Sequence, residues 1–195
     1  MKSRRLTAVV MAVSFALTFP AAAFASDTEA EPVKVDESSL NWEDAEAAID
    51  AAEMDGDYII YDDIAARLWV PVTMKDAEIT EEQEDEGYID AFEDSTYNGT
   101  ISVVLLDSEE MTLETYEEYL KGQSDVKGIT RIGLNDLECT LYQIPSQESI
   151  SAVFETEYHH ILEFTFAPYT EDSDFYPIAN LIIASIQPYF EEETE

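Results

Sequence analysis

The stretch GITRIGLNDLECTLYQIPSQESISAVFETEYHHILEFTFA, residues 128–167, decides the fold of this chain. It is rich in branched and aromatic residues, and three short polar or proline-containing breaks divide it into four segments. Short segments of this composition, separated by turn residues, are typical of β-strands that pair in sequence order. We expect strands over 128–134, 137–144, 150–155 and 161–167, which together form an antiparallel meander.

Further strands and three amphipathic helices are predicted on either side of the meander. Asn98-Gly99 is typical of a tight hairpin in which both central residues have a positive φ, and Pro71 favours an edge position for its strand. Helices are predicted over 42–54, 112–122 and 175–186, and strands over 58–61, 66–73, 88–93 and 100–106. An antiparallel sheet with helices on its faces is an α/β (α+β) fold, here an α/β/α sandwich.

The first 25 residues are predicted to be a secretory signal peptide. Three basic residues precede an uncharged, mostly apolar run over 6–19, and Ala23-Phe24-Ala25 forms a small-x-small cleavage signal. A bilayer-spanning helix needs roughly 20 apolar residues, so a retained membrane anchor is the less favoured interpretation. The residue directly after the cleavage signal is a serine and not a cysteine, which argues against a lipid anchor. We therefore expect a protein that is secreted into the extracellular space.

The remainder of the chain is expected to form one domain. Residues 26–39 are acidic with few large apolar side chains, which predicts a solvated linker. The domain is predicted over 40–190, and the last residues, 191–195, form an acidic tail. Since about 170 residues remain after cleavage of 1–25, the domain is long enough to bury a core of its own.

The charge of the chain excludes some classes of partner. The 44 Asp and Glu against 9 Lys and Arg give a net charge of −35, and three of those bases lie in the predicted signal peptide, which leaves a mature charge near −38. A surface of this sign repels phosphate backbones and anionic headgroups. We therefore expect neither a nucleic-acid partner nor membrane binding after cleavage.

Five stretches carry a resemblance to a known family. They are YIIYDDIAARLWVPVT (58–73), TLETYEEYLK (112–121), GITRIGLNDLECTLYQI (128–144), ISAVFETEYHHILEFTFAPY (150–169) and IANLIIASIQP (178–188). In this pattern the chain resembles the superfamily of the photosystem II extrinsic protein PsbP and the Mog-type Ran-binding factor. The resemblance implies an α/β/α sandwich and a non-enzymatic binding or assembly role, and it carries over no partner-binding residue.

One acidic segment is a candidate calcium site. Asp55, Asp57, Asp62 and Asp63 surround Gly56, and hard cations prefer such carboxylate oxygens. The segment does not fit the spacing of an EF-hand loop, whose first ligand position would fall on an alanine. In so acidic a chain, a solvated turn is the alternative interpretation.

No catalytic motif is present in the sequence, and no cofactor is predicted. Cys139 is the single cysteine, which excludes an internal disulfide, and its alternation with Leu137 and Leu141 predicts burial. His159 and His160 are adjacent and point to opposite faces if they lie on a strand. The aromatic residues that could form a recognition surface are Trp42, Trp69, Tyr88, Tyr97, Tyr116, Tyr119, Tyr142 and Tyr158, but most of them are expected in the core or at half-buried strand positions.

Together these features predict a secreted, non-enzymatic domain that binds an unidentified protein or peptide. The alternatives are an acidic calcium-binding protein and a hydrolase with an unrecognised pair of carboxylates, because 44 acidic residues place some pair at a suitable separation by chance.

Overall fold

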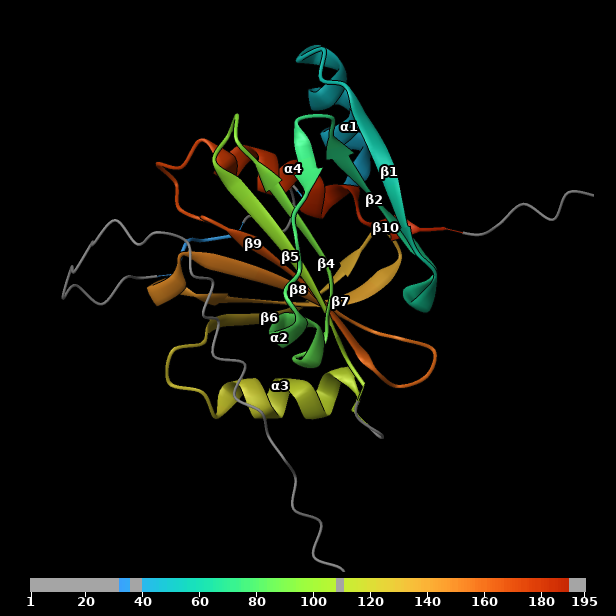
Figure 1. Ribbon diagram of the computed structural model, residues 1–195, viewed down its shortest axis with the longest axis vertical. Helices are drawn as coiled ribbons and strands as arrows, with labels where there is room; N and C mark the ends of the chain where they lie inside the picture. The colour runs from blue at the N-terminus through green and yellow to red at the C-terminus, as the bar shows by residue number, and fades with distance from the viewer. Residues whose placement is uncertain (1–31, 36–39, 108–110, 190–195) are drawn as a thin grey trace, which may run out of the picture.

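The computed structural model describes residues 32–35, 40–107 and 111–189 (Figure 1). The predicted signal peptide, most of the predicted linker and the acidic tail lie outside the described residues.

A seven-stranded antiparallel sheet forms the centre of the fold. Its strand order is β3-β4-β5-β9-β8-β7-β6, so the four strands of residues 128–167 form the predicted meander and β5 pairs with the last of them. The strands are β3 (Met74–Asp76), β4 (Tyr88–Asp94), β5 (Gly99–Leu106), β6 (Lys127–Leu134), β7 (Leu137–Ile144), β8 (Ser149–Glu155) and β9 (Ile161–Ala167).

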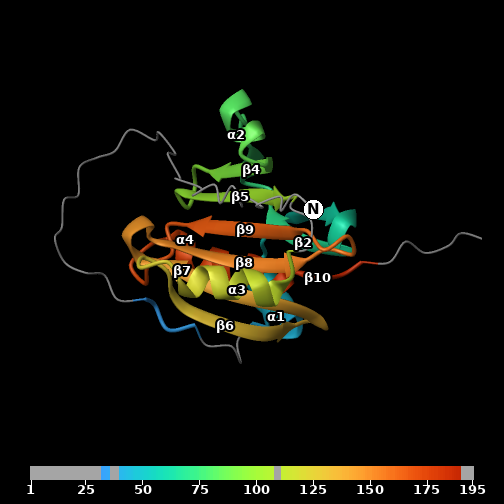
Figure 2. The same ribbon diagram turned by 90° about the horizontal axis from the view of Figure 1, so that it is seen from below.

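Helices cover both faces of this sheet, as the sequence predicted. Helix α3 (Leu113–Lys121) lies on one face, and α1 (Trp42–Ala51) and α4 (Phe175–Ser185) lie on the other (Figure 2). Thr112 caps α3 through a capping box with Thr115. The short helix α2 (Glu81–Asp85) precedes β4.

The alternation of residues along β9 shows how the sequence specifies two cores. Leu162, Phe164 and Phe166 belong to the larger core, which α1 and α4 cover. Ile161 belongs to the smaller core beneath α3, and Glu163 on the same face bonds to a tyrosine of that helix. Successive strand residues point to opposite faces, so the single segment ILEFTFA contributes to both layers.

A second, three-stranded sheet was not predicted. It has the order β1-β2-β10 and lies on the same side of the large sheet as α1 and α4 (Figure 1). Its strands are β1 (Gly56–Tyr61), β2 (Ala66–Pro71) and β10 (Gln187–Pro188). Tyr61 of β1 packs edge-on against Phe164 of β9, with ring centroids 4.9 Å apart, which places this sheet over the larger core.

The edge position predicted for the strand of Pro71 is wrong, because β2 is the central strand of the small sheet. The proline is accommodated because β10 pairs with only Ala66 and Arg67, at the other end of β2. No ladder hydrogen bond to β10 is therefore required of the proline nitrogen.

Ser185, at the end of α4, bonds through its side chain to the backbone of β2, on the side of β2 that β10 pairs with. The Trp69 N–H donates to Ser185 Oγ at 2.8 Å, and this oxygen lies 2.7 Å from the Ile182 carbonyl oxygen and 3.3 Å from that of Trp69. Ser185 is fully buried. Its hydroxyl thus satisfies the backbone of β2 where the pairing strand has become a helix.

Replacing Ser185 by Ala is expected to lower the free energy of unfolding by about 1–3 kcal/mol, because the Trp69 N–H loses its buried acceptor. Urea unfolding followed by fluorescence measures this. Ser149→Ala is the matched control, since the buried Ser149 Oγ has no hydrogen-bond partner in the described part of the chain. Its removal should leave stability unchanged or raise it. Equal losses in the two variants would contradict the role of Ser185.

Candidate binding site

The strand β1 forms an open edge of the small sheet. It pairs with β2 on one side, and none of the described strands pairs with its other side (Figure 1). The register is continuous from Gly56–Pro71 to Tyr61–Ala66, without a bulge. An unpaired strand edge exposes backbone donors and acceptors to solvent and to other chains.

Two large apolar side chains of β1 are exposed to solvent along this edge. Tyr58 is 40% exposed and Ile60 is 44% exposed, and their spacing of two places both on one face of β1. The Trp42 ring contacts the Tyr58 ring in an edge-on arrangement, with centroids 6.0 Å apart. The Arg67 guanidinium lies 4.3 Å from the centroid of the Tyr58 ring. Tyr58 is therefore held in a fixed orientation by an aromatic and a cationic neighbour.

The predicted calcium ligands lie at the two ends of β1. Asp55 and Asp57 lie at its start, and Asp62 and Asp63 open the 3₁₀ turn that follows it (Asp62–Ile64). Asp62 follows Asp57 by five residue steps of extended chain, a distance of about 16 Å. The strand therefore keeps the two pairs apart, and no three acidic, histidine or cysteine residues of the described chain are grouped so that they could hold a metal ion. Calcium binding by these residues stays a prediction.

A buried polar network lies beneath α3 and was not predicted. The carboxylate of Glu163, which is 4% exposed, accepts hydrogen bonds from Tyr116 (2.7 Å), Tyr142 (2.5 Å), Ser151 (2.9 Å) and Thr165 (3.1 Å). Burial, and then the negative charge of Glu163, raise the pKa of both tyrosine hydroxyls well above its usual range. The network joins α3 to β7, β8 and β9.

The single cysteine is buried, and each of the two histidines lies beside a carboxylate. Cys139 is fully buried, and burial raises the pKa of its thiol to about 12, which opposes nucleophilic reactivity. His159 Nδ1 lies 2.6 Å from a Glu155 oxygen, whereas His160 Nε2 lies 3.0 Å from an oxygen of Asp107. The two histidines thus have separate carboxylate partners.

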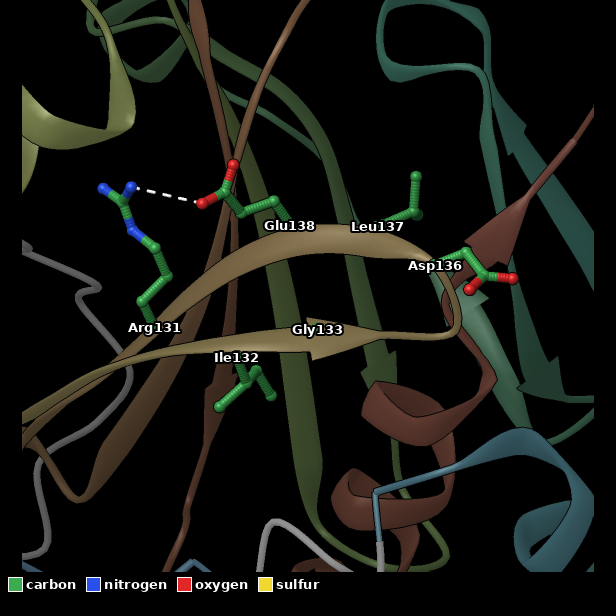
Figure 3. A pocket seen from close by; sticks show the side chains of 6 residues that line it. All are labelled: Arg131, Ile132, Gly133, Asp136, Leu137 and Glu138. Atoms are coloured by element: carbon green, nitrogen blue, oxygen red, sulfur yellow. Dashed lines mark hydrogen bonds and ion pairs between the residues drawn. The ribbon is translucent and has the colours of Figure 1, made fainter.

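A shallow hollow of about 450 Å³ lies on the β6–β7 hairpin (Figure 3). Gly133 contributes to it, since a side chain at this position would meet no atom within 4 Å. Arg131 reaches across the hairpin to Glu138 at 3.2 Å, and it also bonds to Glu117 of α3 at 2.8 Å. Because Arg131 is already paired with two carboxylates, the hollow has no unpaired cation to offer an anionic ligand.

The aromatic residues divide between the core and the surface. Trp69, Tyr88, Tyr116 and Tyr142 are buried, Trp42, Tyr97 and Tyr119 are half-buried, and Tyr158 is 71% exposed. Most of them are thus buried or half-buried, as expected, and the eight residues do not form one exposed patch. No helix within the described ranges is both long enough and apolar enough to cross a bilayer.

Comparison with known proteins gives likenesses of structure alone. No protein-family model matches the sequence, and no curated protein matches it. The solution structure of cyanobacterial PsbP (CyanoP) from Synechocystis sp. PCC 6803 has a TM-score of 0.49 and 12% identity, over 70% of this chain and 94% of that chain. A crystal structure from Bacteroides thetaiotaomicron VPI-5482 has a TM-score of 0.43 and 16% identity, over 73% of this chain and 52% of that chain.

The first of these is a structure of PsbP, the protein type that the sequence resembles, whereas the Mog-type part of the resemblance is not confirmed. Both TM-scores lie below 0.5, so nothing of either protein's role transfers to this chain.

Proposed function

We propose that this protein is a secreted, non-enzymatic domain that binds a protein or peptide partner at the open edge of β1. The observation that carries the proposal is the coincidence of an unpaired strand edge with two exposed large apolar side chains, Tyr58 and Ile60. Exposed apolar groups beside unsatisfied backbone groups gain free energy when a partner covers them.

The partner class follows from the charge of the chain. A net charge of −35 disfavours nucleic acids and anionic membranes and leaves proteins with neutral or basic surfaces. Tyr58 is also of a residue type that is enriched at protein interfaces, because a tyrosine side chain combines a large apolar ring with a polar hydroxyl group.

Affinity capture with the chain from residue 26 onward tests this function. The bait is incubated with culture supernatant and cell-envelope extract of the source organism, beside the double variant Tyr58→Ser, Ile60→Ser and the control Ile89→Ser. Ile89 is 42% exposed on β4, so the control removes a similar exposed apolar side chain away from β1. A partner that the wild type and the control retain, and the double variant loses, is the expected result.

The captured protein is then purified and its affinity for the three baits is measured. We expect the double variant to bind at least about tenfold more weakly, which corresponds to about 1.4 kcal/mol. If all three baits retain the same proteins with the same affinity, or if the wild type retains nothing above an empty matrix, binding at this edge is wrong.

A further inference from the structure

We infer, on the basis of the proposed function, that β1 binds its partner by strand addition, and that the added strand is an extended segment with Lys or Arg on both sides of a short apolar run. The partner would then extend the three-stranded sheet by one strand and form main-chain hydrogen bonds with β1.

The register of β1 determines which backbone groups are available. The Val72 N–H donates to the Asp55 carbonyl oxygen at 3.0 Å, which makes Asp55–Val72 a hydrogen-bonded pair of the antiparallel ladder. Such pairs alternate along two antiparallel strands, so Asp57, Ile59 and Tyr61 direct their N–H and C=O groups toward β2.

The intervening residues Gly56, Tyr58 and Ile60 therefore direct their backbone groups away from β2. An added strand would bond to these three residues. Two of them, Tyr58 and Ile60, carry the exposed apolar side chains, so the backbone and side-chain contacts of one partner would coincide.

The edges of the large sheet are protected against strand addition in ways that β1 is not. The edge strand β3 has only three residues and pairs with only the last part of β4. Helix α2 lies next to β4 (Figure 2). The opposite edge strand, β6, has a register shift between Lys127 and Thr130 and carries the charged Arg131. Short length, irregular register and basic residues are the usual protection of strand edges. β1 has six residues, a regular register and no basic residue.

The charges around β1 select the partner. Asp55, Asp57, Asp62 and Asp63 are all exposed, and none of them takes part in an ion pair within the described residues. They lie at both ends of an edge that is otherwise apolar, which complements cations on both sides of an apolar run. A second copy of this chain is disfavoured as the occupant, because two strands of this kind would bring acidic ends together in a molecule of charge −35.

Hydrogen exchange measured by NMR on the chain from residue 26 onward tests the inference. In the free protein, the amides of Ile59 and Tyr61 should exchange slowly and those of Tyr58 and Ile60 rapidly. The probe is the synthetic octapeptide Lys-Arg-Ile-Thr-Val-Thr-Lys-Arg, added at low ionic strength. Protection of Tyr58 and Ile60 by at least about tenfold, with saturable binding, is the expected result.

Two altered peptides and two protein variants act as controls. A peptide with Glu and Asp in place of its basic residues tests charge selection, and a peptide N-methylated at alternate residues tests main-chain bonding; neither should bind. Ile60→Lys should abolish binding of the probe, whereas Ile89→Lys, at an equally exposed position, should leave it unchanged.

The outcomes separate the mode of binding from the function. If the N-methylated peptide binds as well as the probe, if the charge-reversed peptide does, if the probe does not bind, or if protection appears only outside β1, strand addition is overturned. The binding function would still stand if the captured partner depended on Tyr58 and Ile60. Capture that is insensitive to those two residues would overturn both proposals.

Discussion

Replacing Glu163 by Ala is expected to lower the free energy of unfolding by about 3–5 kcal/mol, the typical cost of removing one partner from a buried charged network. Four hydroxyl groups lose their shared acceptor, and all four belong to buried residues. Single-domain proteins have total stabilities of about 5–15 kcal/mol, so the loss would be a large part of the whole.

The conservative variant Glu163→Gln should lose less, about 1–2 kcal/mol, since the amide oxygen still accepts hydrogen bonds from the tyrosines. The control is Glu118→Ala, on the exposed face of α3, which should change stability by no more than about 0.5 kcal/mol. Urea unfolding curves with equal slopes measure all three. If Glu163→Ala and Glu118→Ala unfold at the same urea concentration, the network does not stabilise the fold.

The elements that the sequence predicted well are those with a strong local pattern. The helix predicted over 112–122 is one residue longer than α3 at each end, the helix predicted over 175–186 is one residue longer than α4 at its C-terminal end, and the four strands of the meander agree closely with the structure. A strand or helix that buries one face has apolar residues at a regular spacing along the sequence. This periodicity can be recognised without knowledge of the tertiary structure.

The strands β3 and β10 could not be predicted in this way. They have three and two residues, too few for any periodicity, and they exist because β4 and β2 offer backbone partners. The small sheet is therefore a product of long-range pairing. For the same reason, the position of β2 between two neighbours could not be obtained from Pro71 alone.

The candidate site was only partly accessible from the sequence. The acidic residues around Gly56 were recognised, but their separation by β1 depends on the chain being extended between them. The exposure of Tyr58 and Ile60 depends on how far Trp42 and α1 cover the sheet. Glu163 did leave a signal: an acidic residue on the alternate face of a strongly apolar strand must find buried partners.

A hairpin forms beside Asn98-Gly99, but its connection spans residues 95–98, so the predicted tight turn with Asn98 and Gly99 as its two central residues is wrong. Asn98 alone of the two has a φ in the left-handed region, at 52°, and Gly99 already belongs to β5, paired with Asp94. The glycine is required by packing instead. A Cβ atom on Gly99 would lie 2.0 Å from the ring of Phe175, which is fully buried at the start of α4.

Gly99→Val is therefore expected to lower the free energy of unfolding by about 3 kcal/mol, at the upper end of what overpacking costs, because Phe175 would have to leave its position in the larger core. Gly133→Val is the matched control: this glycine also lies within a strand, but its side chain would enter open space above the hairpin (Figure 3).

The control should be neutral or gain up to about 1 kcal/mol, since valine favours extended backbone. Thermal and urea unfolding of the two variants decide the question. A smaller loss from Gly99→Val than from Gly133→Val would show that the close approach of α4 to β5 does not determine the residue at position 99. A larger loss of stability from Gly99→Val than from Gly133→Val would show that the two glycines are constrained differently. At position 99 the ring of Phe175 excludes a larger residue, whereas at position 133 no neighbouring atom does.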